Sequence, residues 1–148
     1  MENNLNILRT SFRFEEETYR YLDAFSDHPI GDSYIFSKVF VSFEDFDRFL
    51  KDEQIGLAET FLQRTEALYD ETFFQEHSLV VMFSDERSGS NQLTLESVQT
   101  EGDTILLEIG RERGLTMDMA YLFLFYELEG KEIRSSAVRI TNKPVELW

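Results

Sequence analysis

The sequence contains no cysteine among its 148 residues. This absence excludes disulfide bonds, thiolate catalysis, iron–sulfur clusters and cysteine-ligated zinc sites. It leaves the redox compartment open, because cytosolic and secreted proteins can both lack cysteine. At this length no disulfide or metal is needed to stabilise a core, so we expect packing alone to do so.

Long apolar runs are also missing. No run approaches the roughly 18 apolar residues of a membrane-spanning helix, and the start, MENNLNILRT, lacks the regions of a signal peptide. We therefore expect a soluble chain. Its compartment stays open: cytoplasmic if Met1 is the native start, exported or lipid-anchored if an N-terminal signal was removed.

Basic residues are scarce relative to acidic ones. The chain has 29 Asp and Glu against 14 Lys and Arg, a formal net charge of −15 at pH 7. An anionic surface repels nucleic-acid phosphates and anionic lipid headgroups, so we expect no direct nucleic-acid binding and no membrane insertion. The expected partner is an unknown protein or peptide that is neutral or basic.

Apolar and aromatic residues are plentiful, at 42% and 14% of the sequence. The length suits one domain, and large rings that each bury roughly 150–250 Å² supply much of one core. We predict a single domain over residues 1–148. Residues 1–38 form an N-terminal strand and loop extension in this prediction, and residues 39–148 form a helix pair with a β-meander.

The stretch from residue 69 to residue 90, YDETFFQEHSLVVMFSDERSGS, is the predicted centre of the core. Phe73 and Phe74 lie on a short helical or turn approach. The run Leu79 to Phe83 then places five apolar residues between polar turn formers. Such an unbroken run is typical of a strand that is covered on both faces.

Two helices are predicted before that strand. Ser42 is placed to cap the first helix, with Glu44 and Asp45 in the first turn, where acids meet the positive end of the helix dipole. After Gly56, residues 57–68 predict a second helix. Four apolar residues recur on one stripe of the first helix: Phe43, Phe46, Phe49 and Leu50.

Strand patterns occupy most of the remaining chain, while residues 15–25 fit either a strand or a short helix. We predict an α+β fold in which an N-terminal strand and helix segment and a helix pair pack on an antiparallel β-meander. The meander would form a small sandwich or a partly open barrel. The predicted strands besides the central one are residues 7–14, 34–41, 93–98, 105–109, 119–128 and 133–140.

The combination of FF-x4-LVV, an S-G-S turn and T-M-D-M-A before an apolar strand resembles a group of small exported or lipoprotein domains of low-GC Gram-positive bacteria. The likeness covers Val39 to Ile140, and a weaker one extends to the C-terminal domain of PrcB-type protease-complex accessory subunits. The export signal is missing, and residues 1–38 have no counterpart. The resemblance implies a non-enzymatic β-rich domain with an envelope location. The matching residues are Phe73, Phe74, Leu79, Val80, Val81, Ser88, Gly89, Ser90, Thr116, Asp118 and Ala120.

Residues suited to catalysis or metal binding form no motif. His28 and His77 have no H-x-x-x-H, H-x-H or G-x-S-x-G context and fit ordinary loop or strand-edge positions. The acids at 45–47 and 15–17 lack the spacing of a calcium loop, so solvated charge explains them better. We predict no enzyme, no catalytic residue, no metal and no cofactor, with a carboxylate-based hydrolase as the least favoured alternative.

One polar turn, residues 85–90, has the composition of a recognition surface. Gly89 can adopt a positive φ and let a backbone approach closely, and the flanking hydroxyls offer donors and acceptors. The loop 114–118 can join it in space, although a plain hairpin connector is the simpler interpretation. We predict a non-enzymatic binding or accessory domain, with an acidic decoy of a basic nucleic-acid-binding protein as the alternative. The predicted binding residues are Arg87, Ser88, Gly89, Ser90, Thr116, Met117 and Asp118.

Overall fold

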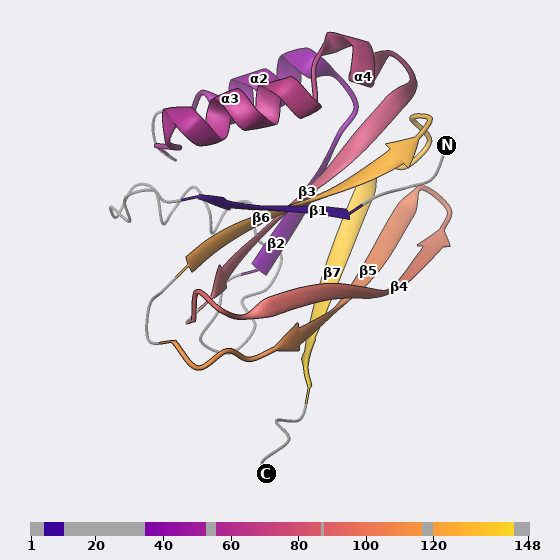
Figure 1. Cartoon of the computed structure of the whole chain (residues 1–148). Coiled ribbons are helices and arrows are strands. Elements are labelled where there is room, and N and C mark those ends of the chain that lie inside the picture. The colour runs from indigo at the N-terminus through magenta and orange to yellow at the C-terminus, as the bar shows by residue number, and fades with distance from the viewer. Residues whose placement is uncertain (1–4, 11–34, 53–55, 87, 117–119, 144–148) are drawn as a thin grey trace.

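The computed structural model describes residues 5–10, 35–52, 56–86, 88–116 and 120–143. Its elements form three layers: helices, a first sheet and a second sheet (Figure 1). The predictions for residues 11–34, including His28 and the acids at 15–17, lie outside the described residues. Those predictions therefore stay untested.

The first sheet has four strands in the order β1-β6-β3-β2, all antiparallel. They are β1 (Leu5–Thr10), β2 (Ile35–Phe40), β3 (His77–Glu86) and β6 (Ala120–Glu129).

The second sheet has three strands in the order β4-β5-β7, with β5 and β7 parallel. They are β4 (Gln92–Glu101), β5 (Thr104–Glu112) and β7 (Ser135–Asn142). The sheets meet where β2 and β7 lie side by side, because Ser136 Oγ donates a hydrogen bond to Ser37 Oγ at 2.8 Å.

The predicted α+β class with mainly antiparallel strands is confirmed. The predicted meander is wrong in its strand order, since β6 returns to the first sheet and β7 runs parallel to β5. The physical reason lies in burial. Strand β6 is apolar on both faces and must lie between two layers, whereas β7 alternates in exposure and suits the edge of a sheet. The described strands form no closed barrel.

In the described part of the chain, three helices cover the outer face of the first sheet (Figure 1). Helix α2 (Phe43–Leu50) begins where predicted, and Ser42 Oγ accepts a hydrogen bond from the Asp45 N–H at 3.3 Å. Helix α3 spans Glu59–Leu68, and the short α4 spans Glu71–Glu76. None of the described helices is long and apolar enough to cross a membrane.

The strand β3 lies at the centre of the molecule, between β6 and β2. Leu79, Val81 and Phe83 point toward the helices, while Val80 and Met82 point toward the second sheet. All five side chains are 0% exposed. The predicted burial of this run on both faces is therefore confirmed, and the strand separates two apolar cores.

The core beneath the helices is built mainly from aromatic rings. Phe46 of α2 is fully buried, and its ring centroid lies 5.5 Å from those of Phe40 and Phe74. It also contacts Phe125 of β6 edge to face, with the centroids 6.3 Å apart. Phe46 therefore connects the helices to both β2 and β6.

A partly buried hydrogen-bond network attaches β1 to the helical layer. Asn6 Nδ2 donates to the Tyr69 hydroxyl and to Glu127 Oε2, both at 2.7 Å. The Tyr69 hydroxyl in turn donates to Glu127 Oε2 at 2.9 Å. Burial is the largest cause that raises the pKa of Tyr69 above its usual value. The hydroxyl therefore stays protonated at neutral pH and remains a donor.

Replacement of Phe46 by alanine should lower the free energy of unfolding by about 3–5 kcal/mol, because it removes a core ring and leaves a cavity. Ser42→Ala on the same helix should cost only about 1 kcal/mol through the lost cap. Urea unfolding followed by circular dichroism measures both. Equal losses in the two variants would contradict the assigned buried face of α2.

Candidate functional site

Two loops meet at the end of the sandwich where β3 and β5 finish: Ser88–Asn91 and Gly114–Thr116, together called the loop pair. Ser88 Oγ lies 2.7 Å from Thr116 Oγ1, and Ser90 Oγ lies 3.0 Å from the same atom. The Ser90 N–H also donates to Thr116 Oγ1 at 3.2 Å. Three hydroxyls from the two loops thus form one hydrogen-bonded cluster.

The close approach of the two loops depends on Gly114. Its N–H donates to Asn91 Oδ1 at 2.7 Å, and a Cβ at this position would lie 2.6 Å from the carbonyl carbon of Ser90. Among the described glycines, positive φ occurs at Gly56, Gly102 and Gly130. The expected role of Gly89 as a residue with positive φ is therefore wrong, and the glycine that this site requires is Gly114.

A buried ion pair lies at the base of the loop pair. Arg111 of β5 donates from Nε to Glu86 Oε1 at 2.7 Å and from Nη2 to Glu86 Oε2. Glu86 is 0% exposed and Arg111 is 8% exposed. The two-pronged geometry satisfies both carboxylate oxygens and joins the last residue of β3 to the second sheet.

Neighbouring polar side chains complete the network around this ion pair. Ser84 Oγ donates to Glu86 Oε2 at 2.6 Å, and Asn91 Nδ2 donates to Glu86 Oε1 at 3.2 Å. Arg111 Nη1 donates to Asn142 Oδ1 of β7 at 3.2 Å. Since Asn91 also accepts from Gly114, the network connects the buried ion pair to both loops.

The structure brings together only part of the predicted binding set. Ser88 is 7% exposed and serves internal hydrogen bonds, whereas Ser90 and Thr116 are exposed. Gly89 is half-buried. Arg87, Met117 and Asp118 lie outside the described residues. Binding at any of these positions stays a prediction.

The sequence prediction missed Glu86 because it placed this residue in the polar turn 85–90, and it missed Arg111 because the predicted strand 105–109 ends before it. The alternation of inward-facing and outward-facing residues along β3 and β5 could have identified this buried pair. The inward positions Val80 and Met82 continue to Ser84 and Glu86, and Ile105, Leu107 and Ile109 continue to Arg111. A carboxylate and a guanidinium at the ends of two apolar alternations indicate a buried pair.

His77 has a structural role at the start of β3. Its ring stacks on Phe73 with centroids 5.0 Å apart, and its Nδ1 lies 3.2 Å from the Phe73 carbonyl oxygen. This agrees with the interpretation of His77 as an ordinary residue before the central strand.

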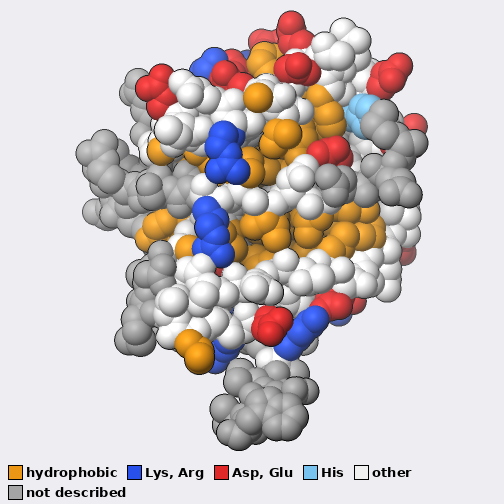
Figure 2. All heavy atoms as spheres, in the orientation of Figure 1, with side chains coloured by type: hydrophobic (Ala, Val, Ile, Leu, Met, Phe, Trp, Pro, Cys, Tyr) orange, Lys and Arg blue, Asp and Glu red, His pale blue; other side chains and the backbone are white. Residues whose placement is uncertain are grey.

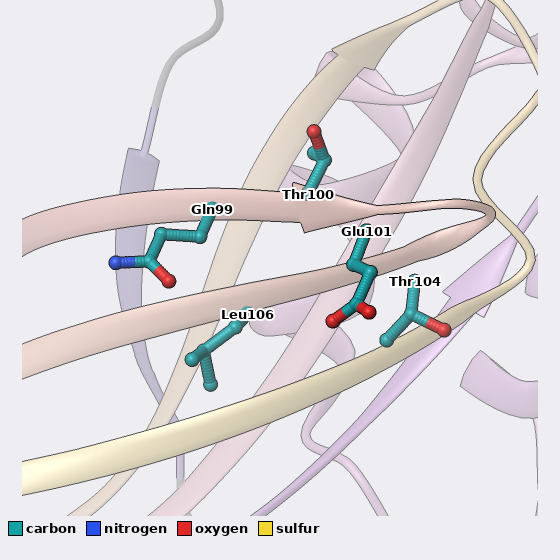
Figure 3. Close-up of a pocket in the computed structure, with 5 residues that line it drawn as sticks. All are labelled: Gln99, Thr100, Glu101, Thr104 and Leu106. Atoms are coloured by element: carbon teal, nitrogen blue, oxygen red, sulfur yellow. The ribbon is translucent and has the colours of Figure 1, made fainter.

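A shallow hollow of about 540 Å³ lies at the β4–β5 hairpin. The Thr100 side chain lies on the opposite face of β4 from the side chains of Gln99 and Glu101 (Figure 3). Thr104 and Leu106 of β5 complete the lining, and Thr104 Oγ1 lies 2.6 Å from Ser135 Oγ of β7. The hollow is an open surface feature with one carboxylate and no buried charged group.

The chain matches no protein-family model, no curated protein and no solved structure.

Replacement of Arg111 by methionine should lower the free energy of unfolding by about 3–5 kcal/mol, because it leaves the Glu86 carboxylate buried without its partner. Combining it with Glu86→Leu should recover most of the loss. Arg139→Met, which breaks the more exposed pair with Glu108, is the control and should change stability by less than about 1 kcal/mol. Urea unfolding measures all three variants. A similar loss in Arg111→Met and Arg139→Met would contradict the structural role of the buried pair.

Proposed function

We propose that this chain is a non-enzymatic binding domain and that the loop pair contacts its partner. The observation that carries this proposal is the hydroxyl cluster, in which Ser90 and Thr116 are exposed and held 3.0 Å apart by loops 26 residues distant in sequence. Hydroxyl groups can both donate and accept hydrogen bonds. Such a cluster suits the polar backbone and side-chain groups of a protein or peptide.

The loop pair is supported by a buried, hydrogen-bonded ion pair, which favours binding. Asn91 joins the loops to the buried Glu86–Arg111 pair through two hydrogen bonds. Loops that are ordered before binding lose little conformational entropy when a partner arrives. More of the interaction free energy then remains for affinity.

The charge of the chain restricts the partner. A net charge of −15 repels acidic surfaces and attracts neutral or basic ones. Several exposed acids are paired with bases, such as Glu44 with Arg48 within α2 and Glu96 of β4 with Lys143. On the face in Figure 2, acidic side chains are dispersed around an apolar band rather than gathered in one patch. This distribution favours a binding domain over the acidic decoy of a nucleic-acid-binding protein.

A capture experiment tests the proposal with the double variant Ser90→Ala/Thr116→Val. The wild-type chain on beads should retain specific proteins, identified by mass spectrometry, and the double variant should retain about tenfold less of them, since it removes hydrogen bonds that the contact uses. The matched control is Thr104→Val/Ser135→Ala, which removes a hydroxyl pair 2.6 Å apart on the second sheet.

The control variant should capture the same proteins as the wild type. Capture by the wild type should decline as the salt concentration rises, because salt screens the opposite charges that accelerate association. Equal capture by the wild type and by both double variants would mean that the loop pair is a connector only. Both double variants should unfold at the wild-type temperature to within a few degrees, because Ser90, Thr116 and Ser135 are exposed and Thr104 is only half-buried.

A further inference from the structure

Among the described residues, the two sheets are joined along one side of the sandwich and not along the other. On one side β2 and β7 are joined by the Ser37–Ser136 hydrogen bond. On the other side the outermost strands are β1 and β4. Within the part of the chain that the structure describes, β1 pairs only with β6, and β4 pairs only with β5. An edge strand presents about half of its backbone N–H and C=O groups away from its one neighbour.

Apolar side chains of the core are exposed between these two edges. Leu5 of β1 and Leu95 of β4 pack against the core between the sheets. Ile7 lies on the same face of β1 as Leu5 and is 38% exposed, while Val98 lies opposite Leu107 and is 36% exposed. Figure 2 shows the resulting apolar band across the face that contains β1 and β4. We call these four residues and the two strand edges the seam.

We propose that the seam binds one extended strand of a partner protein. Added strands are recognised by two kinds of contact: backbone hydrogen bonds to an exposed edge, and pockets for every second side chain. The seam offers both, since its strand edges border an apolar floor. A helix or a folded loop could not use the backbone groups of β1 and β4, so the strand edges determine the conformation of the partner segment.

The chemistry of the seam determines the composition of that strand. Leu5, Ile7, Leu95 and Val98 are uncharged, so the inward side chains of the partner strand are apolar and alternate with polar ones. The segments that flank the strand face a molecule with a net charge of −15, so they carry Lys or Arg. A second copy of this chain would bring two such charges together, which makes it the poorer occupant.

This inference rests on the proposed binding function and extends it to a second contact. The loop pair and the seam are adjacent, because Asn91 directly precedes Gln92, the first residue of β4. A strand that pairs along β4 therefore reaches Ser90 and Thr116 at the end of the seam. One partner segment can contact both surfaces.

The test uses the full chain and a phage-displayed library of random peptides about twelve residues long, because β1 has six residues and β4 has ten. Selected peptides should alternate apolar and polar residues and carry basic residues at their ends. A selected peptide should shift the amide resonances of residues 5–10 and 92–101. Methylation of alternate peptide nitrogens should abolish binding, and this readout needs no protein variant.

Two protein variants locate the contact. Ile7→Lys and Val98→Lys should each weaken the selected peptide about tenfold, since each replaces an apolar contact by a charge. Both positions are more than a third exposed, so the folded state tolerates lysine. Leu68→Lys is the matched control, because Leu68 is 47% exposed on α3 and is not part of the seam; it should bind like the wild type.

Other results would overturn the strand proposal. These are the absence of any selected peptide, selected peptides without alternation, and binding unchanged by Ile7→Lys and Val98→Lys. A dimer of the chain that Ile7→Lys dissociates, or a cross-link from β1 or β4 to another part of the same chain, would identify a different occupant. Peptides that lose affinity only with Ser90→Ala/Thr116→Val would overturn the seam and leave the loop pair as the binding surface.

Discussion

Two neighbouring strands with apolar side chains on both faces determine this fold. Strands β3 and β6 pair along ten positions, and most of their side chains are fully buried. A strand that is apolar on both faces is stable only between two covering layers. Helices cover one face of the β3–β6 pair and the β4-β5-β7 sheet covers the other, so the three-layer arrangement follows from this one requirement.

The candidate binding surfaces follow from where that central pair ends. Beyond its apolar run, β3 continues through Ser84 to Glu86. The Glu86 carboxylate is buried and therefore requires a positively charged side chain as its partner. Arg111 supplies it and thereby fixes the loops that carry Ser90 and Thr116. At the outer edges, β1 and β4 do not meet among the described residues, which leaves the seam open. One surface results from a satisfied buried charge and the other from an unclosed sandwich.

The sequence predicts local features well and long-range pairing poorly. The burial of the apolar run Leu79–Phe83 and the cap at Ser42 are confirmed. Both could be predicted because each depends on residues that are neighbours in the sequence. The parallel pairing of β7 could not be predicted, since it depends on which edge remains free after the other strands have packed. Part of the loop pair was expected from its glycine and hydroxyls. The buried pair of Glu86 and Arg111 was not expected, because a charged residue at the end of a strand resembles the start of a turn. The seam was not expected either, because the sheet topology decides which strand edges stay open.

Amide hydrogen exchange on the native protein tests the central role of the β3–β6 pair most directly. Amides of the central pair should exchange only through global unfolding and share one opening free energy equal to that from urea unfolding. Amides of β4, β7 and α3 should exchange through smaller openings, because these elements lie at sheet edges or on the surface. Exchange in β3 and β6 that is faster than in β4 and β7 would contradict the account.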